Sequence, residues 1–336
     1  MESKLTKGRL TAVVLAIILA LSVAASVQAD PFTFDPDGGG GAAIAQPTNT
    51  FDYQPGNALA VGGQTSVASF ISTGTGTTFS TLFQARLGSI LSPTSADITP
   101  AGLNNTFEIT IVSRFQETTN FATTAAGGIA AFALVPGGVN FIEVYFDPTP
   151  DANSLAGTGF NDGTLIMSGT VTAANSNFQV TSTTPQNLDA FGGTDNYPAI
   201  DSVTGNGSTQ LQGSVNFVDP AFFTQGLAAF ALTLFNTSQV LPFNEVDPSA
   251  MFVFASGGAA PVTAGAGTGV GSLGTVNGCF LGTTCGGGSG GPDVQFQTDA
   301  NQTFRLQQKI PEPSSLLLFG SGLIGLATLI RRIAKK

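Results

Sequence analysis

The chain contains no histidine and no tryptophan, and only 10% of its 336 residues are charged. The absence of histidine excludes Ser-His-Asp and Cys-His catalysis, His-ligated zinc and a histidine pH switch. The charged fraction is far below the roughly 25% of an average soluble domain. What is abundant instead is glycine, with 43 residues, and phenylalanine, with 27 against only 3 tyrosines. The composition therefore describes an acidic protein rich in phenylalanine, threonine and glycine.

Basic residues are scarce between the two ends of the chain. Residues 30–310 hold four of them against nineteen acidic residues, which gives this region a net charge of −15. Such a body repels nucleic acid and anionic lipid and attracts cations or basic surfaces. Nucleic-acid binding is therefore excluded. The four basic residues are Arg86, Arg114, Arg305 and Lys309.

The N-terminus has the three parts of a secretory signal peptide. Three basic residues in the first nine precede an apolar stretch over residues 10–25, which we expect to form the signal helix. Small residues then suit cleavage by signal peptidase before Asp30, and the alternative is an uncleaved membrane anchor. The residues of the predicted cleavage site are Val27, Ala29 and Asp30.

The C-terminus has three ordered features: a Pro-Glu-Pro triplet, an uncharged run over residues 316–330 and a basic cluster. As a helix the run is about 22 Å long, short of the ~30 Å hydrocarbon core unless its flanks contribute. We expect a short transmembrane helix whose basic end stays in the cytoplasm. The triplet is Pro311, Glu312 and Pro313, and the basic cluster is Arg331, Arg332, Lys335 and Lys336.

This tail resembles the PEP-CTERM sorting signal of Gram-negative bacteria. The resemblance implies that a membrane-embedded exosortase recognises the triplet and cleaves nearby. The precursor would be anchored in the inner membrane, and the product would reach the cell surface or extracellular matrix. Paired prolines support this interpretation because they hold the segment extended and remove backbone donors. The alternative is an ordinary C-terminal anchor.

The body shows the alternation of β-strands, with almost no helical periodicity. β-Branched and aromatic runs about ten residues apart, separated by turn residues, predict an all-β sandwich or jelly roll. Residues 255–292 are too glycine-rich for a regular element and are expected to form a flexible loop. The predicted strands lie at 106–115, 139–146, 164–173, 177–182, 210–218, 250–254 and 293–307.

The chain therefore divides into five segments. They are a signal peptide (1–29), a β-rich body (30–254) with a loose lead-in at 30–41, the glycine-rich loop (255–292), a closing strand (293–310) and the sorting signal (311–336). The similar stretches 128–134 and 226–232 leave a duplication within the body open.

Cys279 and Cys285 are the only two cysteines, and they lie within the glycine-rich loop. Because the body is exported, we expect them to form a local disulfide. A catalytic thiol would need a histidine partner, and a zinc site would need two further ligands.

Carboxylates remain as candidates for chemistry, since glycosidases need only a pair of them. The chain lacks tryptophan for a sugar platform, so we expect no enzyme activity and no cofactor, and a hydrolase stays as a third possibility. Two loops, Asp35-Pro-Asp37 and the segment from Asp147 to Asp151, could hold a structural Ca²⁺ through oxygen ligands. The candidate carboxylates are Glu108, Glu117, Glu143, Asp147, Asp151 and Asp162. Glu108 lies on the polar side of its strand, where a charge is usually solvated.

Three stretches of the body resemble PEP-CTERM proteins associated with flocculation, at residues 54–63, 155–171 and 293–304. The resemblance implies a secreted matrix component that helps bacteria to aggregate. We therefore predict a non-enzymatic surface or matrix protein that supports aggregation, flocculation or biofilm structure. Exosortase and signal peptidase are its expected partners, with exopolysaccharide as a further one. The alternative is a carbohydrate- or calcium-binding adhesin.

Overall fold

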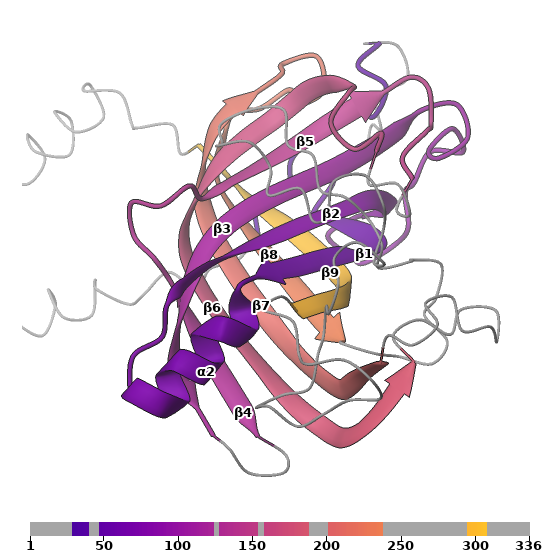
Figure 1. Ribbon diagram of the computed structural model, residues 1–336. Coiled ribbons are helices and arrows are strands. Elements are labelled where there is room, and N and C mark those ends of the chain that lie inside the picture. Colours follow the sequence, from indigo (N-terminus) through magenta and orange to yellow (C-terminus); the bar gives the residue numbers. More distant parts are fainter. Residues whose placement is uncertain are drawn as a thin grey trace, which may run out of the picture.

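The computed structural model describes residues 29–39, 47–123, 128–153, 158–187, 201–237 and 294–307. These residues form nine antiparallel strands and one helix (Figure 1). The strands are β1 (Thr50–Val61), β2 (Thr78–Leu91), β3 (Glu108–Ala122), β4 (Ile129–Leu134), β5 (Phe141–Asp147), β6 (Thr164–Asn187), β7 (Asp201–Val218), β8 (Leu227–Thr237) and β9 (Val294–Leu306). The predicted all-β class is confirmed.

The sheet closes on itself, because every described strand is hydrogen-bonded on both sides. The order runs β2-β1-β9-β8-β7-β6, and β2 also pairs with β3. Between β3 and β6 the position is shared: β4 pairs with one end of β3 and β5 with the other, and both pair with β6. Strands β1, β2, β3 and β5 face β6 to β9 across the interior (Figure 1). The two layers expected of a sandwich are thus joined at both edges.

Alternation along the strands separates the interior from the outer surface, as the pleat of a strand requires. In β3, the side chains of Ile109, Ile111 and Phe115 belong to the main core inside the sheet. Val112, between them, packs into a second apolar cluster on the outer side of β1, β2, β3 and β5. β9 is the predicted closing strand, and it pairs with β8 on one side and with β1 on the other.

Phenylalanine fills the interior. Phe32, Phe34, Phe51, Phe223 and Phe304 are at most 2% exposed, and their ring centroids lie 4.8–6.5 Å apart. Most of these pairs have tilted or edge-to-face geometry, which the quadrupole of the ring favours. Two of the five come from the segment expected to be a loose lead-in. That expectation is wrong for residues 30–35, since two large rings there fill space that the closed sheet encloses.

A helix that the sequence analysis did not predict, α2 (Gly63–Thr73), packs against β2 and β3. It begins after Gly62 (φ 83°) and ends at Gly74 (φ 78°), both in the left-handed conformation that glycine adopts at no steric cost. Ser66 fixes it, donating its hydroxyl to the carbonyl of Thr77 (2.5 Å) and sharing a hydrogen bond with the hydroxyl of Thr119 (2.8 Å). Only Gly63, Ser66 and Val67 of this helix are buried, so its sequence has no clear helical pattern of apolar residues from which the helix could be predicted.

Several predicted segments lie outside the described residues. They are the signal helix, the strand at 250–254, the glycine-rich loop with Cys279 and Cys285, and the sorting tail. Within the described ranges, no helix combines the length and the apolar character needed to cross a membrane.

The first prediction concerns the N-terminal segment in the core. Phe34→Ala should lower the free energy of unfolding by about 3–5 kcal/mol, because it removes a fully buried ring and leaves a cavity. Phe235→Ala is the control, since that ring is 53% exposed, and it should cost less than about 0.5 kcal/mol. Urea denaturation measures both. A loss of unfolding free energy for Phe34→Ala as small as that expected for Phe235→Ala would contradict a role of Phe34 in the core.

Candidate functional site

The outer side of β6 and β7 forms an extended polar face, which we name the polar face. Its exposed side chains alternate with buried ones along both strands, and the register places them in cross-strand rows such as Gln179 opposite Asn206 and Asn175 opposite Gln210. The polar ones are Thr170, Thr172, Asn175, Asn177 and Gln179 of β6, and Asn206, Gln210, Gln212, Ser214 and Asn216 of β7, and Phe217 at the end of β7 is exposed as well. Hydroxyl and amide groups thus line this surface in dense rows.

The polar face is almost free of charge. Strands β6, β7 and β8 together contain one ionisable residue, Asp201 at the start of β7. The body as a whole carries a net charge of −15, so its negative charge is concentrated elsewhere. An uncharged surface of donors and acceptors suits a hydroxyl-rich polymer, because no fixed charge has to be desolvated on contact.

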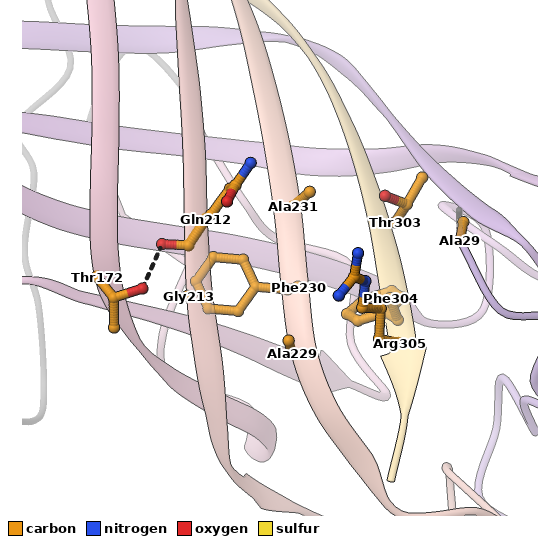
Figure 2. A pocket seen from close by; sticks show the side chains of 10 residues that line it. All are labelled: Ala29, Thr172, Gln212, Gly213, Ala229, Phe230, Ala231, Thr303, Phe304 and Arg305. Atoms are coloured by element: carbon orange, nitrogen blue, oxygen red, sulfur yellow. Dashed lines mark hydrogen bonds between the residues drawn. The ribbon is translucent and has the colours of Figure 1, made fainter. Parts of the chain in front are cut away.

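A pocket of about 200 Å³ opens where this face continues onto β8 and β9 (Figure 2). Ala229 and Ala231 of β8 have small side chains, and they leave a depression between Gln212 on one side and Arg305 on the other. Thr172 donates its hydroxyl to the carbonyl of Gln212 (3.3 Å), which joins the pocket to the polar face. The other lining residues are Gly213, Phe230, Thr303, Phe304 and Ala29, and the predicted cleavage before Asp30 would remove Ala29 from the mature protein.

This pocket offers amide and hydroxyl groups together with one guanidinium, a planar group with five donors. The arrangement can bind a hydroxyl- or carboxylate-bearing ring. The sequence did not predict this pocket, because the sheet order decides that β7, β8 and β9 are neighbours. The only sequence signal was that Arg305 is one of four basic residues in the body.

The structure gathers three of the candidate carboxylates. Oxygens of Asp147, Asp151 and Asp162 lie within 4.8 Å of one another, and we name this group the aspartate cluster. Desolvation, and then the charges of Asp162 and Asp147, raise the pKa of Asp151. In the part of the chain that the structure describes, this is the one such acidic group.

The other loop considered for Ca²⁺ gathers no third carboxylate among the described residues. Asp35 is buried, and its Oδ1 accepts a hydrogen bond from the backbone N–H of Asp37 (3.3 Å). Asp37 in turn accepts from the N–H of Gly39 (2.9 Å), and this bond is the main cause of its lowered pKa. The carboxylates of Asp35 and Asp37 thus both accept hydrogen bonds from backbone N–H groups of the same turn.

Glu108 and Glu143 lie on the outer side of the sheet, yet both are buried. The solvated position expected for Glu108 is therefore wrong, and burial raises its pKa despite hydrogen bonds from two backbone N–H groups. Glu143 accepts a hydrogen bond from the hydroxyl of Tyr145 (2.7 Å), and burial likewise raises its pKa. Alternation assigned the strand side correctly but could not show that other parts of the chain cover it.

Glu117 points into the closed sheet and is 2% exposed. Its carboxyl group accepts hydrogen bonds from the hydroxyls of Thr81 on β2 (2.9 Å) and Ser176 on β6 (2.5 Å). Burial dominates over these two bonds and raises its pKa to about 7. The interior therefore contains a carboxyl group that is half protonated near neutral pH.

Comparison with protein families yields one match, which falls on the tail. The PEP-CTERM protein-sorting motif matches residues 309–332, and these include the Pro-Glu-Pro triplet. The chain carries a PEP-CTERM sorting signal. Searches of curated proteins and of solved structures gave no significant match.

The PEP-CTERM signal marks an exported protein that an exosortase processes. Its matched segment begins three residues after β9 ends at Leu306. The last strand of the closed sheet and the sorting signal are therefore neighbours in the chain. Of the predicted sorting residues, Pro311, Glu312, Pro313, Arg331 and Arg332 lie within the matched segment, whereas Lys335 and Lys336 follow it.

The second prediction concerns Glu117 of this PEP-CTERM protein. Its pKa is about 7 in the folded state and 4.5 ordinarily, so the folded chain binds the proton more tightly. The free energy of unfolding should therefore fall as the pH rises from about 4.5 to about 7. Glu117→Gln should remove this loss, which amounts to about 3 kcal/mol above pH 7.

Urea denaturation of both proteins between pH 4.5 and pH 8 measures this effect. At the lowest pH the carboxyl group is protonated in wild type, so the difference there reports packing alone. A difference between variant and wild type that stays constant across this range would contradict the raised pKa.

Proposed function

We propose that this protein acts without catalysis at the cell surface or in the extracellular matrix, where it supports aggregation, flocculation or biofilm structure. The sorting motif at residues 309–332 is the observation that carries the proposal, since it directs export and exosortase processing. The resemblance of parts of the body to flocculation-associated PEP-CTERM proteins supports the finer role.

The position of the motif suits release of an intact body. Four residues separate Leu306, the end of β9, from Pro311. Cleavage near the triplet would leave β9 whole, with both of its neighbours, β1 and β8, still paired. The released product would then keep the closed sheet without a membrane segment.

Exopolysaccharide is the partner that we propose for the polar face and its pocket. Rows of exposed hydroxyl and amide groups can exchange hydrogen bonds with water for hydrogen bonds with sugar hydroxyls. A neutral surface also avoids the repulsion that the acidic body would exert on an anionic polymer, and Arg305 adds a donor for carboxylates. A binding role of this kind is compatible with the adhesin alternative.

The third prediction tests the sorting signal. Replacing Pro311, Glu312 and Pro313 with alanine should abolish processing, because the charge and the extended backbone are lost together. The variant should stay in the inner membrane at precursor size, and fractionation with an antibody against the body detects it. The control is alanine at Ser314 and Ser315, directly after the triplet, which should be processed normally. A triple variant that reaches the matrix at wild-type size would contradict exosortase sorting.

The fourth prediction tests the pocket. Gln212→Ala and Arg305→Ala should each weaken binding to the exopolysaccharide of the producing bacterium by about tenfold, the effect of losing roughly 1.4 kcal/mol. Gln210→Ala is the matched control, since Gln210 is exposed on the same side of β7 but does not line the pocket. Co-sedimentation with the polysaccharide measures binding. Equal effects of Gln210→Ala and Gln212→Ala would remove the pocket from the proposal and leave the face as a whole.

A further inference from the structure

The aspartate cluster joins two segments of the chain on the outer side of the sheet. Asp147 is the last residue of β5, Asp151 follows in the next turn, and Asp162 precedes β6. Asp147 accepts the backbone N–H of Thr149 at its Oδ1 (2.7 Å), which folds the turn back toward the sheet. The fold thus brings carboxylates together although like charges repel.

The second segment is held against the first by local structure. Gly159 has a φ of 77°, and a Cβ there would lie 2.4 Å from Oδ1 of Asp151, so only glycine permits this approach. Phe160 is 2% exposed in the outer apolar cluster, and its carbonyl accepts the hydroxyl of Thr110 (2.7 Å). The position of Asp162 therefore follows from an anchored segment.

Glu108 provides an independent observation that points to a ligand. It lies directly opposite Asp147 in the pairing of β3 with β5, and it is fully buried. Its Oε1 accepts the backbone N–H groups of Asp151 (2.9 Å) and Ala152 (2.8 Å), so the carboxyl group faces the loop that carries the cluster. Its Oε2 is buried beside this loop and has no hydrogen-bond partner. A buried carboxylate oxygen without a donor is costly unless a cation compensates it.

The charges around this loop are strongly unbalanced. The oxygens of the three aspartates lie within 4.8 Å of one another, and the carboxyl group of Glu108 is hydrogen-bonded to the backbone of the same loop. The charge of Arg86 on β2 acts on Glu108 and offsets part of this negative charge. A divalent cation would supply the positive charge that offsets the rest.

We propose that Asp147, Asp151 and Asp162 bind one Ca²⁺, with Glu108 positioning the loop from the sheet side. Ca²⁺ takes oxygen ligands only, at 2.3–2.6 Å, so ligand oxygens on opposite sides of the ion stand about 5 Å apart. Mutual separations within 4.8 Å meet this limit. Mg²⁺ usually keeps several waters and is held by only one or two carboxylates, so three converging carboxylates favour Ca²⁺. Water and backbone carbonyls complete a coordination number of six to eight.

This site would fasten the turn after β5 to the segment before β6. Ca²⁺ binds the folded chain, where the three aspartates meet, in preference to the unfolded chain, where they are separated. The proposal is independent of sorting and of polysaccharide binding, since its residues lie outside the polar face and the tail.

The fifth prediction tests this site in the full-length chain, purified in detergent and depleted of metal with a chelator. Calorimetric titration with CaCl₂ should give one site per chain, and Ca²⁺ should raise the melting temperature, with a weaker effect from MgCl₂. Asp151→Asn and Asp162→Asn should each weaken Ca²⁺ binding at least tenfold. Glu108→Gln should weaken it by about 10–100-fold, the usual cost of losing a group that orients metal ligands.

Asp299→Asn is the matched control, because Asp299 is an exposed aspartate on β9 outside the cluster. It should leave Ca²⁺ affinity unchanged. Both aspartates of the cluster to be replaced are exposed, so their variants should fold. No binding by wild type at millimolar CaCl₂ would overturn the proposal. So would an equal loss of affinity in Asp299→Asn and Asp162→Asn, which would indicate non-specific attraction by the acidic body.

Discussion

Closure of the sheet is the constraint on which the rest of this structure depends. Each described strand pairs with a neighbour on both sides, and only the ends of β6 and β7 extend beyond β4 and β8, where they pair with each other. A closed sheet encloses a volume that side chains must fill, and here phenylalanine fills much of it. The need to fill that volume explains why residues 30–35, which belong to none of the nine strands, place Phe32 and Phe34 among the rings of β1 and β9.

Closure also explains how the ends of the body are arranged. Residues 238–293 separate β9 from β8 in the sequence, yet β9 completes the sheet between β8 and β1. The N–H of Asp30 donates to the carbonyl of Phe304 (3.0 Å), so the predicted mature N-terminus lies beside the last strand. Both predicted processing points therefore adjoin β9. Export at one end and release at the other would leave the pairing of this strand untouched.

The distribution of charge divides the molecule into surfaces with different chemistry. The back strands β6, β7 and β8 hold one ionisable residue, Asp201, and expose many hydroxyl and amide groups beside Phe217 and Phe235, while the front strands and their loops hold Glu108, Glu117, Glu143 and the aspartate cluster. Burial raises the pKa of each of these three glutamates. A protein that carries so few charges thus uses several of them in places where water is excluded, and such placement costs free energy unless a proton or a cation compensates it.

The sequence by itself determined the strand character of the body and the sorting signal, because alternation, turn residues and the Pro-Glu-Pro triplet are local patterns. It also placed Glu108 on the polar side of its strand, which is the outer side of the sheet. It could not determine sheet closure or the burial of Phe34, nor the covering of Glu108, because each depends on segments distant in the chain. The aspartate cluster shows the same division: Asp147 and Asp151 were recognised as one acidic loop, whereas Asp162 joined them only in the structure. Its approach requires the left-handed turn at Gly159 and the anchoring of Phe160, and these are contacts that only the tertiary structure decides.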